Sequence, residues 1–150
     1  MLPNTYQVQR LQELITSMVQ CCEDRKLYER GRFDLPYAEV RCIMFFRGER
    51  YLTAKSISER MDVAKSRVSK LIESLIKKGF LERSDDPSDA RVKLICLTLS
   101  GKAKVKEVNL FHQKIHAKLL MQMGLDERSD LLANLERLRG AMEVVKKDLA

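Results

Sequence analysis

The 150-residue sequence lacks the short motifs that mark the common enzyme classes. It has no glycine-rich phosphate loop, no Gly-x-Ser-x-Gly elbow, no His-Glu-x-x-His pair and no cysteine with a catalytic partner. No apolar run approaches the length of a membrane span, and the N-terminus has no charged segment that leads into a hydrophobic stretch. These absences predict a cytoplasmic protein that is not an enzyme and has no cofactor.

Cysteine is scarce, and none of the four cysteines forms a Cys-x-x-Cys pair. In a reducing compartment such residues are free thiols by default, so neither a disulfide framework nor a zinc ribbon is expected. Cys22 falls on the apolar side of a predicted helix, with Cys21 at its edge, and only Arg25 and Lys26 are nearby cations that could activate a thiol. We interpret both cysteines as small buried hydrophobes.

The charge balance is positive. The chain has 28 Lys and Arg against 21 Asp and Glu, which gives a formal net charge of +7 and a pI near 9.3. This excess suits a polyanionic partner but is weak evidence unless the cations share one surface. A chain of this length can bury one core, so residues 1–150 are predicted to form a single domain.

Two short helices stand at the centre of the chain. Residues 53–61 predict the first, with Thr53 as its N-terminal cap and Ile57 and Met61 on its inner face. After a turn at residues 62–64, residues 65–78 predict a second helix that Gly79 ends. Its apolar stripe is Val68, Leu71, Ile72, Leu75 and Ile76. Its outward face is basic and rich in hydroxyls: Lys65, Ser66, Arg67, Ser69, Lys70, Glu73, Lys77 and Lys78. Such a face fits a DNA major groove.

A β-hairpin is predicted after the basic helix. Residues 80–84 and 91–98 are short runs rich in branched residues, and residues 85–90 between them are turn formers. Arg91 near the tip can enter a minor groove, while Asp89 can hold its guanidinium by a bidentate pair. Helix, turn, basic helix and hairpin together predict a mostly α-helical winged helix-turn-helix over residues 36–98.

Long helices are predicted on both sides of this lobe, over residues 5–30 and 99–149. Each carries apolar residues three and four apart, and Leu131, Leu135, Leu138, Met142, Val145 and Leu149 repeat along the last segment. Thr98 or Ser100 is expected to cap the helix after the hairpin, and Asp126 the last one. A single small domain cannot use all these stripes alone, so we predict dimerisation helices and a homodimer. Two recognition helices related by a two-fold axis imply a pseudopalindromic operator.

The run from Leu52 to Gly101 resembles the MarR family of bacterial transcriptional regulators. The matching segments are Leu52-Thr53, residues 68–71, residues 78–81, Arg83, the wing from Asp85 to Arg91, and the closing residues 97–101. Two residues depart from the family pattern. Ala64 stands where a capping Ser or Asp is usual, and Asp62 stands where Gly is common, although Asp tolerates a left-handed backbone.

The resemblance implies a transcriptional repressor that binds double-stranded DNA and is released from it by a small-molecule effector. Activation of transcription is the open alternative. The residues expected at the DNA are Thr53, Lys65, Ser66, Arg67, Ser69, Lys70, Arg83, Asp89 and Arg91. The effector crevice is expected between the first, second and fifth helices, at Met18, Cys22, Tyr37, Arg41 and Phe111.

Other interpretations of the same sequence stay open. A thiol sensor would use Cys21 or Cys22. A metal-responsive regulator would use His112 and His116, which lie one helical turn apart but need further ligands, such as Glu39, Cys42 or Glu107. We predict no metal site. A winged helix that binds an acidic protein partner is the alternative from another functional class.

Overall fold

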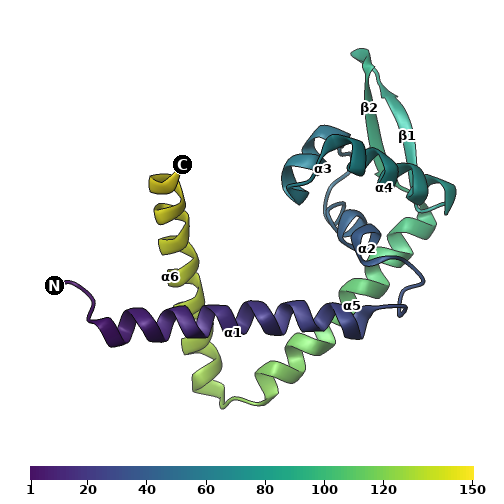
Figure 1. Ribbon diagram of the computed structural model, residues 1–150. Coiled ribbons are helices and arrows are strands. Elements are labelled where there is room, and N and C mark those ends of the chain that lie inside the picture. Colours follow the sequence, from purple (N-terminus) through teal and green to yellow (C-terminus); the bar gives the residue numbers. More distant parts are fainter. The chain divides into compact units, whose positions relative to one another are not determined.

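The computed structural model describes residues 1–150 and contains six helices and one two-stranded antiparallel sheet (Figure 1). The elements are α1 (Thr5–Glu29), α2 (Tyr37–Met44), α3 (Ala54–Met61), α4 (Lys65–Lys77), β1 (Leu81–Asp86), β2 (Asp89–Leu97), α5 (Leu99–Met121) and α6 (Leu125–Leu149). The predicted class, mostly α-helical with a hairpin wing, is confirmed. Two compact units divide the chain after Val108, within α5. None of the helices combines the length and apolar character needed to cross a bilayer.

Short-range signals set the ends of α3 as predicted. The Ser56 amide donates to Thr53 Oγ1 at 3.2 Å, so Thr53 caps the helix. Ile57 and Met61 are buried. Asp62 adopts φ 54° and ψ 49°, the left-handed conformation that lets the chain turn directly into the next helix.

The recognition helix α4 packs on α2, α3 and β1 through the buried side chains of Val68, Ile72 and Leu75. Leu71 and Ile76, the other members of the predicted stripe, are only half-buried. Ala64 provides no side-chain cap at the first turn, as expected. Gly79 follows the helix with φ 81°, a conformation in which most other residues are strained.

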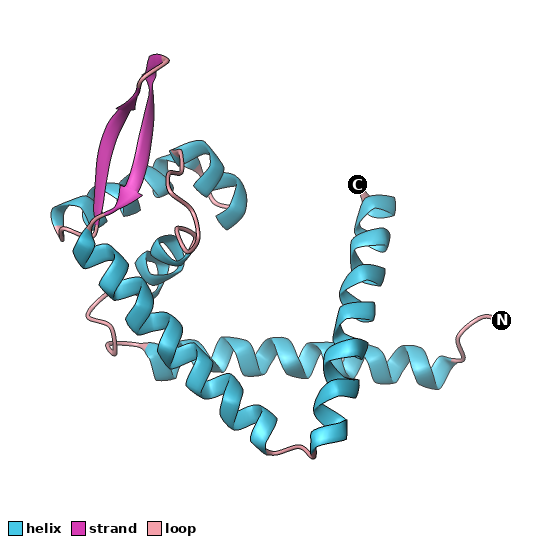
Figure 2. Cartoon of the chain, turned by 180° about the vertical axis from the view of Figure 1, so that it is seen from behind, coloured by secondary structure: helices cyan, strands magenta, loops and turns pink.

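The hairpin turn is shorter than predicted. β1 and β2 extend to Asp86 and Asp89, so only Pro87 and Ser88 form the turn (Figure 2). The Asp86 carboxylate accepts from both the amide and the hydroxyl of Ser88, at 2.8 and 2.6 Å, and these bonds close the turn within two residues. The expectation of a turn over residues 85–90 is therefore wrong. A register shift follows, because Asp85 pairs with Lys93 while Asp86 pairs with Asp89.

One backbone bridge was not predicted. Leu52 and Ile95 exchange both amide hydrogen bonds, at 2.9 and 2.8 Å, so the segment before α3 pairs with β2. Both side chains are buried. This bridge ties the base of the wing to the start of the helix-turn-helix.

The start of α5 is fixed by contacts with the turn after α4. Thr98 Oγ1 accepts from the Gly101 amide at 3.0 Å and donates to the Gly79 carbonyl at 2.5 Å, so Thr98 rather than Ser100 is the cap. The Thr98 amide also donates to the Phe80 carbonyl at 3.1 Å. A Cβ atom at Gly101 would lie 2.0 Å from that same carbonyl oxygen. Only glycine allows α5 to approach this closely.

The last helix begins two residues earlier than an Asp126 cap would require. The Gly124 amide donates to the Glu127 carboxylate at 2.6 Å, and α6 starts at Leu125. The prediction of Asp126 as the cap is wrong, because Glu127 reaches back to the free amide from the third helical position.

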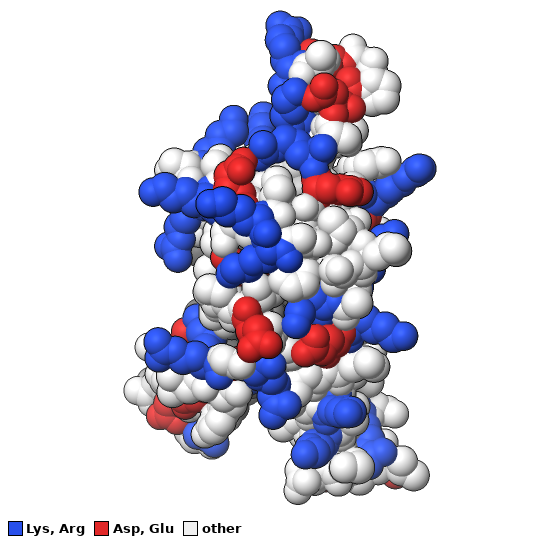
Figure 3. Space-filling view, turned by 90° about the vertical axis from the view of Figure 1, so that its right-hand side faces the viewer, with Lys and Arg blue, Asp and Glu red and all other residues white.

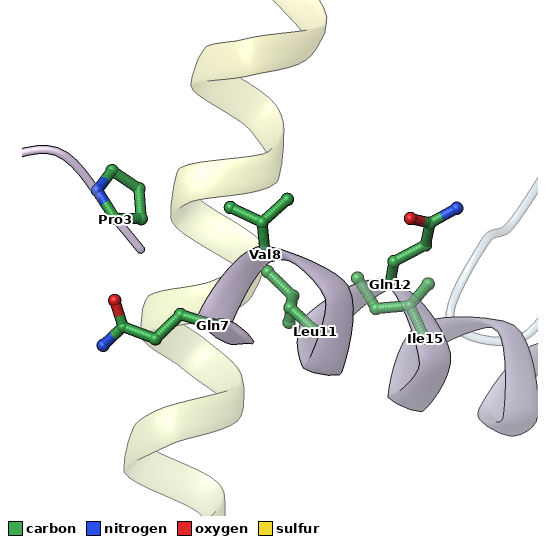
Figure 4. Close-up of a pocket in the computed structure, with 6 residues that line it drawn as sticks. All are labelled: Pro3, Gln7, Val8, Leu11, Gln12 and Ile15. Atoms are coloured by element: carbon green, nitrogen blue, oxygen red, sulfur yellow. The ribbon is translucent and has the colours of Figure 1, made fainter. Parts of the chain in front are cut away.

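The terminal helices expose their apolar stripes. In α1, Val8, Leu11 and Met18 are exposed, and Figure 4 shows Val8, Leu11 and Ile15 beside Pro3 around a shallow hollow. In α6, no residue is buried, and the stripe members Leu135, Met142, Val145 and Leu149 are exposed. Each helix thus carries an apolar face that a single chain leaves open to water.

Replacing Gly101 by Ala should destabilise the fold by about 2–4 kcal/mol, because the added methyl group overlaps a backbone oxygen that cannot move away alone. Urea denaturation measures this difference. Gly140→Ala is the matched control, since nothing lies within 4 Å of a Cβ at that helical position. This control should gain up to about 1 kcal/mol from helix propensity. Equal stability of the two variants would contradict the packing argument.

Candidate nucleic-acid interface

The N-terminal half of α4 presents unpaired cations. Lys65, Arg67 and Lys70 are exposed, and none of them has an acidic partner. Ser66 is exposed beside them, and Ser69 donates its hydroxyl to the Lys65 carbonyl at 3.0 Å. Figure 3 shows Lys and Arg side chains gathered around the wing and the helices at its base. The N-terminal part of the outward face predicted for this helix is therefore exposed and basic.

Near the C-terminal end of α4, carboxylates hold two cations, Lys78 and Arg83, whereas Lys77 is exposed without an acidic partner. Lys78 donates to the Glu39 carboxylate at 2.6 Å, and Arg83 of β1 donates to Glu73 at 2.5 Å. Arg83 was predicted at the DNA; it lies instead in a pair between β1 and α4. This pair braces the wing against the helix, and any DNA contact by Arg83 stays a prediction.

Arg91 is the most exposed cation of the wing, with 92% of its side chain accessible. Its Nε and one terminal nitrogen donate to the two oxygens of Asp89 at 3.1 and 3.3 Å, and its amide donates to the same carboxylate at 3.0 Å. The side-chain and backbone bonds from Arg91 lower the pKa of Asp89 below its usual value. The bidentate geometry proposed from the sequence is thus observed, and it points a restrained guanidinium into solvent.

The role of Thr53 that the structure shows is to cap the N-terminus of α3. Its hydroxyl accepts the Ser56 amide at the start of α3, and it is half-buried. A capped amino end also concentrates backbone N–H groups that suit a phosphate. Contact between this cap and DNA stays a prediction.

The five residues expected at an effector divide between the two units. Met18, Cys22, Tyr37 and Arg41 belong to the first unit and are exposed, whereas Phe111 belongs to the second and is half-buried. Tyr37 lines a shallow hollow at the end of α1, where Lys26 lies 5.1 Å from the centre of its ring. The effector crevice stays a prediction.

The thiols fall into two groups. Cys42 is buried, and burial together with the nearby Glu39 carboxylate raises its pKa to about 12. Burial and a hydrogen bond to Glu82 raise the pKa of Cys96. Cys21 and Cys22 are exposed, so the expectation that they are buried is wrong for the single chain: the stripe of α1 that carries Cys22 is uncovered. A thiol-sensing role for this pair stays a hypothesis.

Removing the arginine should raise the pKa of Asp89. In Arg91→Ala the largest cause of the lowered value is gone, so the carboxylate should titrate closer to 3.8. The pair is intact above the ordinary Asp value and is lost only as the pH falls through the lower value of the folded protein. Carbon-13 NMR of the side-chain carboxyls measures the Asp89 pKa in the wild type and in the variant. Asp86 is the internal control, because Ser88 rather than Arg91 lowers its pKa. An unchanged Asp89 titration would contradict the pairing.

Comparison with known proteins agrees with this geometry. The sequence profile of the MarR family matches residues 33–92. The chain is 27% identical over 120 residues to the uncharacterized HTH-type transcriptional regulator YfiV of Bacillus subtilis (strain 168), covering 78% of this chain and 73% of that protein. It is similar in structure to FabT of Streptococcus pneumoniae, solved in complex with DNA, with a TM-score of 0.77, 25% identity, and coverage of 92% and 99% of the two chains.

A MarR family protein from Bacillus stearothermophilus has the same fold, with a TM-score of 0.85 at 20% identity over 95% of this chain and 99% of that one. The matched profile, the relatives in sequence and the shared arrangement of helices and wing agree with one another. Residues 33–92 match the MarR family, and the chain as a whole resembles transcriptional regulators of that family in sequence and fold.

Proposed function

We propose that this protein is a dimeric, sequence-specific DNA-binding repressor whose operator affinity falls when a small molecule binds. The observation that carries the proposal is the outward face of α4, where Lys65, Arg67 and Lys70 are unpaired beside Ser66. Cations on one rigid surface neutralise phosphates, and a helix of this kind fits the major groove. The FabT structure, which is a complex with DNA, supports the same use of the fold.

The wing supplies the second contact. Arg91 is exposed and held by Asp89, so its guanidinium loses little conformational freedom when it enters a minor groove. Narrow minor grooves attract arginine through their negative potential, whereas the major-groove helix reads base edges. One subunit therefore can contact both grooves of a half-site.

The exposed stripes of α1 and α6 support a homodimer. Each stripe repeats at helical spacing, and burial of such a surface is favourable at roughly 25 cal/mol per Å² of apolar area. A second copy provides a matching surface through two-fold symmetry. The resulting pair of recognition helices suits a pseudopalindromic operator, and we propose that the protein acts in the cytoplasm.

Effector control then follows from a shift between two dimer geometries. A ligand weakens operator binding only if it prefers the geometry that does not fit DNA. Met18, Cys22, Tyr37, Arg41 and Phe111 are the residues that we propose for its crevice.

The DNA-binding proposal is tested by enriching an operator from a random duplex pool with the wild-type protein and measuring fluorescence anisotropy against a scrambled duplex. A specific site should bind at least about a thousandfold tighter at physiological salt. Arg91→Ala should lose about 1–3 kcal/mol of operator affinity. Arg139→Ala, an exposed arginine of α6 paired with Glu136, is the control and should bind normally. Failure to enrich any sequence would refute the proposal.

The dimer is tested with a charge placed in the apolar stripe. Leu138→Asp should shift the protein from dimer to monomer at micromolar concentration, because a buried unpaired carboxylate at an interface costs several kcal/mol. Light scattering measures the mass. Ala133→Asp puts the same charge on the opposite, exposed face of α6 and should leave the dimer intact. A wild-type monomer would exclude the dimer proposal directly.

A further inference from the structure

A buried carboxylate, that of Glu39, accepts two hydrogen bonds from residues near the C-terminal end of the recognition helix α4. Glu39 of α2 has only 5% of its surface exposed. One of its oxygens accepts the Ser74 hydroxyl at 2.5 Å, and the other accepts the Lys78 ammonium at 2.6 Å. Ser74 and Lys78 are one helical turn apart, about 6 Å along the axis of α4. A single side chain thus holds α4 at two successive points.

These two hydrogen bonds restrain the position of α4 in a way that apolar packing does not. The buried stripe of Val68, Ile72 and Leu75 fixes which side of α4 faces the core, but apolar contacts are weakly directional. Two hydrogen bonds to one carboxylate define the rotation and the axial position of the helix together. Side chains that read bases must be placed within about 0.5 Å of their working geometry. A restraint of this kind therefore bears on specificity.

The other end of α4 has no comparable restraint. Its first turn begins at Ala64 without a side-chain cap, and three unpaired cations, Lys65, Arg67 and Lys70, lie in this half. The helix is consequently held by side-chain hydrogen bonds near its C-terminal end, at Ser74 and Lys78, and Glu39 is the buried acceptor of both bonds.

The ion pair between Glu39 and Lys78 also neutralises the positive charge of Lys78. Lys78 has 39% of its side chain exposed, yet its ammonium is committed to Glu39. A free lysine at this place would attract phosphate of any sequence, which raises non-specific binding. Pairing with Glu39 removes that contribution from the basic face.

We propose that Glu39 is a positioning residue for DNA recognition: through Ser74 and Lys78 it sets the orientation of α4 and keeps the Lys78 charge away from DNA. The proposal rests on the proposed function. Glu39→Gln keeps the shape of the side chain but removes its charge, and two opposite effects follow. Specific affinity should fall because the two hydrogen bonds are weakened, whereas affinity for scrambled DNA should stay equal or rise because Lys78 is released.

The test compares wild type, Glu39→Gln, Lys78→Met and the double variant by anisotropy, on the enriched operator and on a scrambled duplex. The ratio of specific to non-specific affinity should fall about tenfold in Glu39→Gln, the size of one hydrogen bond to a charged group. The effects of Glu39→Gln and Lys78→Met on the operator should be less than additive, because both break one network. Lys78→Met should leave the salt slope of operator binding unchanged, whereas a phosphate contact would lower it by about one.

Glu49→Gln is the matched control. Glu49 pairs with Arg60 of α3 at 3.0 Å rather than with a residue of α4, so the affinity ratio of this variant should equal that of wild type. Glu39→Asp provides the rescue test, since it retains the charge and should recover part of the ratio.

Each other outcome contradicts the proposal in a distinguishable way. If wild type discriminates between the duplexes and Glu39→Gln keeps both affinities, only the role of Glu39 is wrong. If Glu39→Gln loses both affinities equally and its Tm falls, the residue merely stabilises the fold. If wild type shows no preference, the proposed function fails and this inference fails with it.

Discussion

Exclusion of water from one side of α4 is the constraint on which the DNA-binding lobe depends. Val68, Ile72 and Leu75 are almost completely buried against neighbouring elements, and each such side chain contributes about 1.5–3 kcal/mol on burial. Because helical geometry then places the far side of the helix away from the core, Arg67 and Lys70 must face solvent. The core therefore decides which residues can meet DNA. The polar contacts of Glu39, Glu73 and Thr98 refine a placement that burial has already selected.

Features that arise from residues close in the chain could be predicted from the sequence. The cap at Thr53, the left-handed Asp62 and the bidentate pair of Asp89 with Arg91 each involve partners within a few residues, so local rules were sufficient. The hairpin turn and the start of α6 were wrong in detail because polar side chains accept amides that the sequence pattern did not single out. Asp86 accepts the Ser88 amide and closes the turn early, and Glu127 accepts the Gly124 amide at the start of α6. Which amide a side chain reaches is not revealed by spacing alone.

Contacts between distant segments escaped prediction for another reason. Leu52 with Ile95 and Glu39 with Lys78 join residues about forty positions apart, and no local pattern indicates which partner each will meet. In the sequence, Glu39 was only a possible metal ligand, and Lys78 was one of several outward cations. The structure places the two together and gives Glu39 a role that its residue type did not suggest. The predicted basic face is exposed, but its cations differ: Lys65, Arg67 and Lys70 are unpaired, whereas Lys78 forms an ion pair with Glu39.

The terminal helices leave their apolar stripes exposed in the single chain. A helix of 25 residues without a single buried side chain, as in α6, gains little tertiary stabilisation within its own chain. Helices in proteins depend mainly on packing of an apolar face, so the stripe of α6 and that of α1 require a partner surface. If a second copy provides it, the separation of two α4 helices is set by the same contacts that keep the terminal helices folded. DNA affinity and assembly then share one set of interactions, and an effector that alters the packing of the terminal helices changes the fit to the operator without touching α4.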